Sequence, residues 1–248
     1  MRGSNSGSSV SVIIPVKNAE RYLREALESV TAQTHAPGEV VVVDGASTDR
    51  SAAIAATFSG VRMIQQEGEG LAEALNTGVR RATCGLITFL SSDDRWLSRK
   101  LEKQVAFFVA NPGAELLITR MRWFVNEGGA LPSGFRRELL EDDVIGRVPE
   151  TLMCRRAAFD RIGWFDPRYR LAMDSDWFAR AKDQGLRLDL LDETLVQKRI
   201  HARNLSHSDV TVQNRELLAL LRQSVKRQRR ESDTTEVSEA DAPAPNAD

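Results

Sequence analysis

Long apolar runs are missing from this chain of 248 residues. No apolar stretch approaches the roughly 20 residues that a membrane-spanning helix requires, and the first residues lack the apolar segment of a signal peptide. We therefore expect a soluble, cytoplasmic protein. The alternative is a location at the inner face of the membrane, which the basic C-terminal segment described below would favour.

The chain also has few cysteines and a small net charge. The only two cysteines, Cys84 and Cys154, are far apart and form no CxxC or zinc spacing, so neither a disulfide scaffold nor a zinc module is expected. The 34 basic and 35 acidic residues leave a net charge of −1. Such a balance argues against a nucleic-acid partner, because nucleic-acid binding relies on an excess of positive charge.

The usual phosphate-binding glycine motifs are absent too. Gly68 and Gly70 do not complete a GxGxxG motif after the first predicted strand, and the chain has no GxxxxGK[ST] loop. A dinucleotide-dependent oxidoreductase and a P-loop ATPase are therefore disfavoured.

Short β-branched runs alternate with segments of helical periodicity. The runs at 11–16, 39–43, 61–65 and 86–90 have the length and composition of buried strands, and 22–30, 51–58 and 71–82 have helical spacing between them. Successive βα units predict an α/β fold: a Rossmann-like layered, mainly parallel sheet flanked by helices.

The chain divides into five predicted parts. A polar leader (1–9) and an acidic, Ala- and Pro-rich tail (231–248) have the composition of flexible segments. Between them we expect a first half (10–110), a second half of the same domain (111–210) and a C-terminal helix (211–230).

Two adjacent carboxylates follow the fourth predicted strand. Leu86–Leu90 is followed at once by Ser91, Ser92, Asp93 and Asp94, at the strand end where open α/β sheets bind ligands. A divalent cation shared with substrate phosphates would relieve the repulsion between the two acids. Taken alone, the pair is more typical of a surface turn that caps the next helix.

Asp44 ends the second predicted strand and is followed by Gly45. Its carboxylate is suited to accept a hydrogen bond from a base N–H or a ribose hydroxyl, and glycine lets a ligand approach the backbone closely. A simple turn residue is the competing interpretation.

Four segments in order, at family-like spacing, resemble the family 2 glycosyltransferases with their glycosyltransferase-A fold. They are SVIIPVKNAERYLREALESVTAQT, EVVVVDGASTDRS, EGLAEALNTGVRRA and LITFLSSDD. The resemblance covers roughly Ser11–His207.

The resemblance implies a nucleotide pocket. Pro15, Val16 and Asn18 would line it, with Asp44 contacting the base and Ser47 nearby. Asn76 would position the nucleotide, or else serve as a helix-surface or capping amide. Asp93 would lie by the ribose and the metal, and Asp94 would be the direct metal ligand. Ser91 and Ser92 depart from the more acidic form of the family motif.

A second resemblance lies in the segment that follows Ile162-Gly163-Trp164-Phe165-Asp166. The run Met173–Arg180, MDSDWFAR, is similar to the acid-rich catalytic helix of the family. By that alignment Asp174 is the base that deprotonates the acceptor hydroxyl, and Asp176 is the alternative. Met173 replaces the usual Glu. Both acids are also typical of a helix start.

A late Arg-x-His segment, Arg199 to His201, resembles the family segment from which a histidine completes the metal site or touches the diphosphate. Imidazole suits manganese better than magnesium. Arg199 and Arg203 are alternative sources of charge compensation for the leaving group.

The C-terminal stretch 212–230 combines leucines with a run of arginines and a lysine. A basic amphipathic helix of this kind can rest on an anionic membrane surface, which would suit a lipid-linked acceptor. The ordinary explanation is a helix that docks on the domain.

These observations predict a metal-dependent, inverting glycosyltransferase that uses Mn²⁺ or Mg²⁺. It would move a sugar from a nucleotide-diphosphate sugar donor to a hydroxyl of a glycan, lipid-linked or small-molecule acceptor. A catalytically silent protein that binds a sugar nucleotide or a partner on the same fold is the main alternative, and a nucleotidyltransferase is a weaker one.

Overall fold

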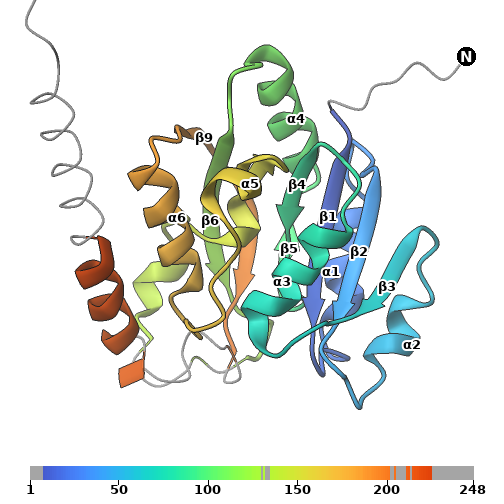
Figure 1. Ribbon diagram of the computed structural model, residues 1–248. Helices are drawn as coiled ribbons and strands as arrows, with labels where there is room; N and C mark the ends of the chain where they lie inside the picture. The colour runs from blue at the N-terminus through green and yellow to red at the C-terminus, as the bar shows by residue number, and fades with distance from the viewer. Residues whose placement is uncertain are drawn as a thin grey trace, which may run out of the picture.

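The computed structural model (Figure 1) describes residues 8–129, 131, 135–201, 204, 211–212 and 214–224. Most of the predicted leader, all of the predicted tail and Arg203 lie outside these residues. One sheet runs through both predicted halves, with its strands in the order β3-β2-β1-β4-β8-β6-β9-β5 and with β7 paired to β6. Among the described residues, no helix combines the length and apolar character needed to cross a membrane.

The first four strands are parallel, as predicted. They are β1 (Val10–Val16), β2 (Glu39–Asp44), β3 (Val61–Gln65) and β4 (Leu86–Phe89). Both faces of β1, β2 and β4 are buried, which explains why their sequences are nearly continuous apolar runs rather than alternating ones. Val16 pairs with Asp44 at the carboxyl ends of β1 and β2.

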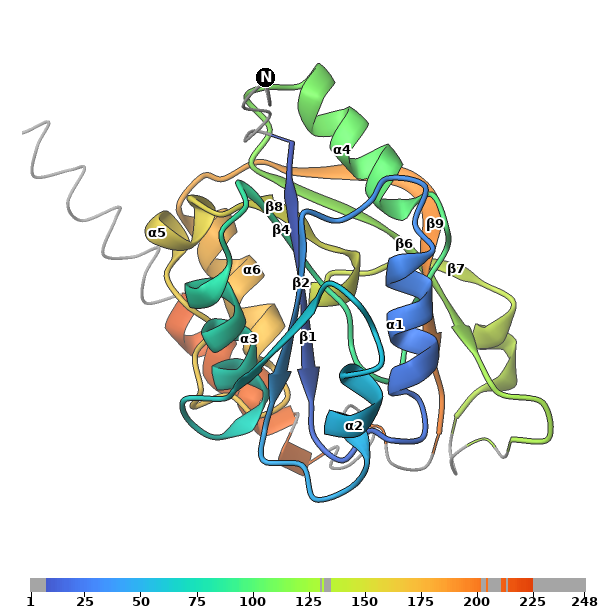
Figure 2. The ribbon, with the colours of Figure 1, turned by 90° about the vertical axis from the view of Figure 1, so that its right-hand side faces the viewer.

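Helices cover both faces of this parallel part. The helix α1 (Leu23–Thr31) lies on one side with α2 (Ser51–Ala55), and α3 (Gly70–Arg81) lies on the other, as Figure 2 shows. Two apolar clusters result, one on each side of the sheet. The inward-facing apolar residues of α1 are those whose spacing predicted the helix.

The second half of the sheet is mixed, so parallel pairing is confined mainly to the first half. β8 (Met153–Arg155) is antiparallel to both β4 and β6 (Leu116–Phe124), whereas β6 and β9 (Leu188–Arg199) are parallel. The remaining elements are listed by position: β5 (Arg95–Trp96), α4 (Lys100–Ala110), the 3₁₀ turns η1 (Arg137–Leu140) and η2 (Pro149–Thr151), β7 (Asp143–Ile145), α5 (Ala158–Ile162) and α6 (Met173–Asp183).

The last described segment is helical at residues 211, 212 and 214–224 and lies beside α6 (Figure 1). Leu217 packs against the α3-side cluster, and Ser224 donates to Asp183 at the end of α6. The predicted helix therefore docks on the domain over this part of its length.

Gly78 lets α3 approach β1 closely. A methyl group on its Cα would lie 2.3 Å from Cγ2 of Ile13, which is fully buried. Because the rigid core cannot move away cheaply, the small side chain is needed here for packing rather than for backbone freedom.

We predict that Gly78→Ala destabilises the protein although alanine is the better helix former. Overpacking costs about 1–3 kcal/mol, which exceeds the roughly 1 kcal/mol that alanine contributes to a helix. Gly113→Ala is the matched control, since no atom lies within 4 Å of its added methyl group. Urea unfolding of both variants measures the difference, and equal midpoints would refute the packing argument.

Candidate active site

The loops after β1 and β2 are tied together at the carboxyl edge of the sheet. The backbone N–H of Asn18 donates to Ser47 Oγ (3.0 Å), and Asn18 Oδ1 accepts from the backbone N–H of Thr48 (2.8 Å). Asn18 has a positive φ of 52°, a conformation that asparagine tolerates better than most residues. Pro15 and Val16 lead into this loop, so four of the predicted nucleotide-site residues lie next to one another.

Asp44 lies beside this pair of loops with its carboxylate largely buried. It accepts hydrogen bonds from the backbone N–H of Ser47 (3.2 Å to Oδ1) and from Gln65 Nε2 (3.3 Å to Oδ2). These bonds orient the carboxylate at the end of β2 and hold the Ser47 loop against it.

Asn76 does not belong to this group, and the structure corrects that prediction. Its amide is buried in α3, donates to the carbonyl of Phe165 (2.8 Å) and accepts from the Phe165 N–H (3.0 Å). Both ends of the amide are therefore used to hold the backbone of the Gly163–Asp166 turn. Neither a nucleotide contact nor a helix-surface amide describes this residue.

Asp93 and Asp94 have different surroundings. The Asp94 side chain is 2% exposed, with Oδ1 accepting from the backbone N–H of Arg199 (2.7 Å) and Oδ2 from Lys198 Nζ (3.0 Å). The Asp93 side chain is 26% exposed, and its Oδ2 lies 2.9 Å from His201 Nε2. Asp93 is thus the more exposed of the two carboxylates, and Asp94 is enclosed by protein. The role of Asp94 as the direct metal ligand stays a prediction.

His201 extends the available part of the site. Its ring lies against that of Tyr22, with the centroids 4.9 Å apart, and its Nε2 faces Asp93. Although burial would raise the pKa of Asp93, the His201 hydrogen bond and the Lys198 charge hold it below its usual value. An ionised carboxylate and an imidazole therefore lie side by side at the end of β4.

Glu150 was missed by the sequence argument. It lies in η2, its Oε1 is 2.8 Å from Lys198 Nζ and also accepts from Ser91 Oγ, and its Oε2 is buried without a hydrogen-bond partner. Burial would raise the pKa of Glu150, but the Lys198 charge lowers it. A lone acid far along the chain from Asp94 carries no local signal, because only tertiary folding brings η2 beneath the β4 loop.

Lys198 immediately precedes the Arg199–His201 segment and was also missed by the sequence argument. Burial alone would lower its pKa, but Asp94 and Glu150 raise it above the usual value, so the ammonium group stays charged. Burial, together with Asp93 and Glu150, raises the pKa of Asp94 to about 7 against the opposing charge of Lys198. One cation is thus shared by more acids than it can neutralise.

Arg199 is buried, which corrects its predicted role beside the leaving group. Its side chain is 1% exposed, its Nε donates to the carbonyl of Asp93 (2.7 Å), and its Nη1 and Nη2 donate to Asn126 and Glu25. Its guanidinium carbon also lies 4.6 Å from the ring centroid of Tyr22. Arg199 therefore holds the site together from within.

Asp174 and Asp176 also divide into an accessible and an enclosed acid. Asp176 is buried and forms an ion pair with Arg180 (2.8 Å), which in turn donates to the carbonyls of Ile162 and Trp164. Asp174 is half-buried and within electrostatic range of Glu150 and Lys198. Burial raises the pKa of Asp174 to about 6, and the Glu150 charge acts in the same direction.

The start of α6 is held by the C-terminal helix. The Glu216 carboxylate accepts hydrogen bonds from the backbone N–H groups of Arg170 (2.9 Å), Leu171 (2.8 Å) and Ala172 (2.9 Å). No side chain of the loop itself caps α6. Glu216 thus binds the N–H groups of the turn that leads into α6, including that of the N-cap residue Ala172, and fixes the turn that precedes Asp174.

The donor set fits a divalent cation only in part. Asp93 and His201 supply oxygen and nitrogen ligands suited to Mn²⁺, while the described residues contain no group of three or more His, Cys, Asp or Glu side chains arranged to hold a metal. A cation bound here would therefore need further oxygen ligands, such as phosphate oxygens and water.

Comparison with known sequences gives a consistent family relationship. Residues 11–163, more than half of the chain, match the family model described as glycosyl transferase family 2. EpsE of Bacillus subtilis is 30% identical over 79% of this chain and 74% of its own length. The uncharacterized glycosyltransferase RP339 of Rickettsia prowazekii is 27% identical over 78% of this chain, but this chain spans only 64% of RP339.

Two solved structures have a similar fold. The crystal structure of S. aureus TarS 1-349 in complex with UDP is 25% identical, with a TM-score of 0.64 over 77% of this chain and 60% of that chain. Glucosyl-3-phosphoglycerate synthase from Mycobacterium tuberculosis, in complex with Mn²⁺, UDP and phosphoglyceric acid, also has a TM-score of 0.64, over 88% of this chain and 79% of that chain. At 18% identity the second likeness concerns the fold alone.

Proposed function

The chain belongs to glycosyl transferase family 2, and on that premise we propose that it moves a sugar from a nucleotide-diphosphate donor to an acceptor hydroxyl with inversion at the anomeric carbon. The observation that carries the proposal is the pairing of an accessible acid with raised pKa, Asp174, with the Asp93–His201 pair at the same edge of the sheet.

The donor nucleotide is proposed to bind over the joined loops after β1 and β2. Asn18, Asp44 and Ser47 are held by one another's hydrogen bonds, so a ligand meets polar groups that are already oriented. UDP is the first nucleotide to test, because the TarS structure contains UDP. Pro15 and Val16 would form the apolar floor beside it.

Mn²⁺ or Mg²⁺ is proposed to bind at Asp93 and His201 together with the donor diphosphate. A divalent cation there supplies charge neutralisation for the leaving diphosphate. Asp93 provides a carboxylate that its neighbours keep ionised, and the M. tuberculosis synthase, which has the same fold, holds Mn²⁺ and UDP together. Asp94 keeps the backbone of Arg199 in place rather than touching the cation.

Asp174 is proposed to take the proton of the acceptor hydroxyl. As the proton moves to the carboxylate, the acceptor oxygen forms its bond to the anomeric carbon and the bond to the diphosphate oxygen breaks on the opposite face. This is one displacement, so the anomeric configuration inverts. A pKa of about 6 keeps the carboxylate mostly ionised at neutral pH while leaving it basic enough to accept a proton.

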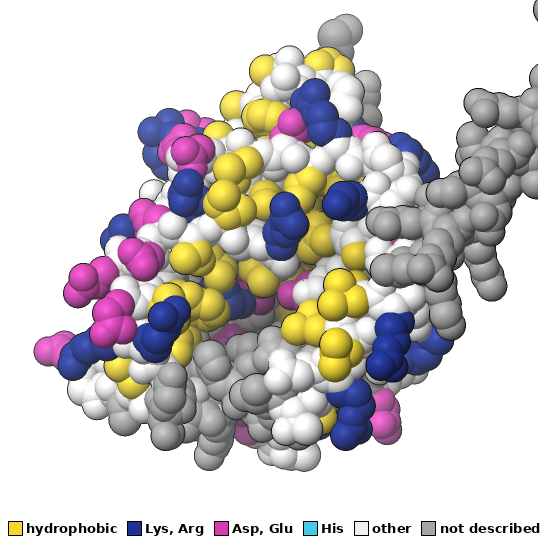
Figure 3. Space-filling model, turned by 90° about the vertical axis from the view of Figure 1, so that its left-hand side faces the viewer, with side chains coloured by type: hydrophobic (Ala, Val, Ile, Leu, Met, Phe, Trp, Pro, Cys, Tyr) yellow, Lys and Arg dark blue, Asp and Glu magenta, His cyan; other side chains and the backbone are white. Residues whose placement is uncertain are grey.

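The C-terminal helix is proposed to bring the protein to the inner face of an anionic membrane, where a lipid-linked acceptor would be found. Leu218 and Leu221 are 56% and 60% exposed, and Arg215 and Arg222 in the same helix are also exposed. Figure 3 shows apolar side chains interspersed with Lys and Arg on this side of the molecule. Apolar and basic groups on one helix face match the chemistry of an anionic lipid surface.

Asp93→Asn and Asp94→Asn should fail in different ways. We predict that Asp93→Asn keeps the unfolding temperature of the unsubstituted protein but loses the Mn²⁺-dependent part of UDP binding. Asp94→Asn should instead unfold more easily, by about 1–3 kcal/mol, because the amide oxygen cannot accept from both Lys198 and the Arg199 N–H, and one buried donor loses its partner. Thermal unfolding with and without UDP and Mn²⁺ measures both effects. UDP binding that is unchanged by a chelator would remove the metal from the proposal.

Asp174→Asn should retain donor and metal binding while transfer falls about 100- to 10,000-fold.

In the unsubstituted protein the rate of transfer should rise as pH increases through about 6, because only the ionised Asp174 carboxylate accepts a proton. The rate should then level off. Donor turnover measured as a function of pH shows whether the rate rises through about pH 6. NMR of the product gives its anomeric configuration. A retained configuration, or full activity in Asp174→Asn, would contradict the mechanism and favour a silent sugar-nucleotide binder.

Membrane contact is tested by sedimentation with vesicles. The unsubstituted protein should sediment with vesicles that contain phosphatidylglycerol and should remain in the supernatant with purely zwitterionic vesicles. A Leu218→Ser and Leu221→Ser double variant should lose this binding, whereas Leu97→Ser, at an exposed leucine outside the helix, should not. If the double variant sediments with the vesicles as much as Leu97→Ser does, the C-terminal helix does not bind the membrane.

A further inference from the structure

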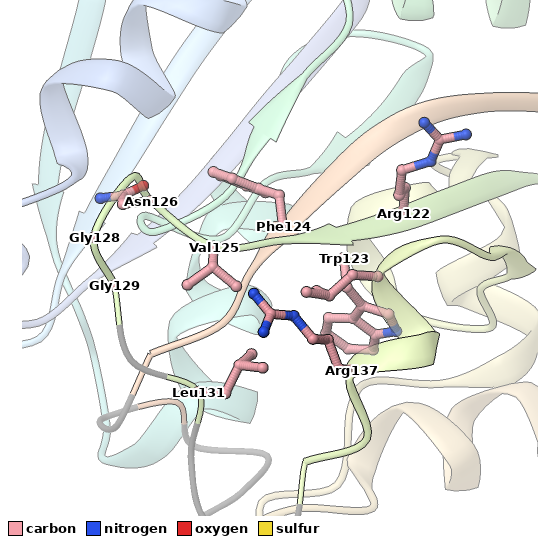
Figure 4. Close-up of a pocket in the computed structure, with 10 residues that line it drawn as sticks. Arg122, Trp123, Phe124, Val125, Asn126, Gly128, Gly129, Leu131 and Arg137 are labelled. Carbon is pink, nitrogen blue, oxygen red and sulfur yellow. The ribbon is translucent and has the colours of Figure 1, made fainter.

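A pocket of about 460 Å³ lies where β6 ends, between the end of this strand and the turn η1 (Figure 4). Its walls combine aromatic and aliphatic groups with arginine and glycine. The residues that line it are Arg122, Trp123, Phe124, Val125, Asn126, Gly128, Gly129, Leu131, Arg137 and Leu140.

Among the described residues, the lining of this pocket carries positive charge and no acid. Arg122 is neutralised by Asp143, with 2.8 Å between Nε and Oδ1. Figure 4 shows that the Arg122 side chain points away from the hollow, whereas the Arg137 guanidinium extends into it between Val125 and Leu131. In the part of the chain that the structure describes, Arg137 has no ion-pair partner.

The pocket adjoins the active site through the strand pair β6 and β9. Trp123 is the register partner of Lys198, which binds Asp94 and Glu150, and the backbone N–H of Ile200 donates to the carbonyl of Phe124 (2.8 Å). Asn126, on the rim of the pocket, accepts a hydrogen bond from Arg199. The pocket therefore lies beside the residues that precede His201.

Apolar side chains surround the Arg137 guanidinium in the pocket. Trp123 packs edge-on against Phe135, with the ring centroids 6.3 Å apart, and Leu131 and Val125 flank Arg137. Arg137 itself is exposed, so an anion that enters the pocket can reach its guanidinium. A guanidinium in such a place suits a planar or tetrahedral anion that accepts two parallel hydrogen bonds.

We infer that this pocket is a subsite for an anionic group of the acceptor, a phosphate or a carboxylate, with Arg137 as the cation that binds it and Trp123 as the apolar wall beside the attached sugar or glycerol unit. The inference rests on the proposed function, because it assigns an acceptor class to that reaction. A neutral acceptor would leave the Arg137 charge without a counterpart in the complex.

Arg137→Gln tests the subsite, and Arg136→Gln is its matched control. The two arginines are adjacent and both exposed, but only Arg137 lines the pocket. The probes are glucose 1-phosphate, glucuronate and glucose, and the signal is the indole N–H resonance of Trp123, identified by its loss in Trp123→Phe. Titration of each probe gives a Kd for each protein.

Glucose 1-phosphate or glucuronate should shift the Trp123 resonance, and glucose at the same concentration should not. Arg137→Gln should weaken anion binding at least about 10-fold, since a charged hydrogen-bond pair is lost, while Arg136→Gln should bind as the unsubstituted protein does. Preference for one anion over the other distinguishes a phosphate from a carboxylate subsite.

Equal binding of glucose and the anions, or an unchanged Kd in Arg137→Gln, would overturn the subsite. UDP binding with Mn²⁺ by the unsubstituted protein, measured in parallel, tests the proposed function separately. If UDP does not bind but the anions do, the proposed transfer fails, and with it the assignment of the anion to an acceptor. If UDP binds and the sugars bind without regard to charge, only the anionic subsite fails.

Discussion

The buried Arg199 guanidinium is the interaction on which the rest of the site depends. An unpaired cation in the interior would be costly, so its place requires partners on several elements at once. The carbonyl of Asp93 after β4, Glu25 on α1 and Asn126 after β6 all accept its hydrogen bonds. Its own backbone N–H binds Asp94. Three segments that are distant in sequence are thereby held at fixed positions around this residue at the end of β9.

This constraint explains why the acids of the site have unequal roles. Asp94 and Asp176 are each enclosed by a cation, Lys198 and Arg180, and serve the framework. Asp93 and Asp174, which precede the enclosed acids by one and two residues, keep access to a ligand. Enclosed acids hold the backbone turns, so the accessible acids need little reorganisation when a charged ligand arrives. The sequence alone does not show which acid of each pair, Asp93–Asp94 and Asp174–Asp176, is the accessible one.

The catalytic candidate Asp174 is supported from outside the matched family region. The family match ends at residue 163, whereas Glu216 in the C-terminal helix binds the N–H groups that precede α6. The helix packs along α6 from its first turn to Asp183. Its inner face thus orients the helix of the proposed base, while its outer leucines and arginines are left for the proposed contact with a membrane. One helix would connect acceptor location with catalytic geometry.

The sequence by itself determined the parallel half of the fold and the positions of the candidate acids. Buried strands and amphipathic helices leave periodic patterns that depend only on neighbouring residues, so β1 to β4 and the three helices between them were predicted with bounds close to those observed. The mixed half has short strands, such as β8, whose pairing depends on distant partners. Only the tertiary structure decided that Asp93 rather than Asp94 is accessible, that Asn76 is a core clamp, and that Glu150, Lys198 and Glu216 join the site. Adjacent acids look alike in a sequence; burial and the long-range placement of a counter-charge separate them, and neither is encoded locally.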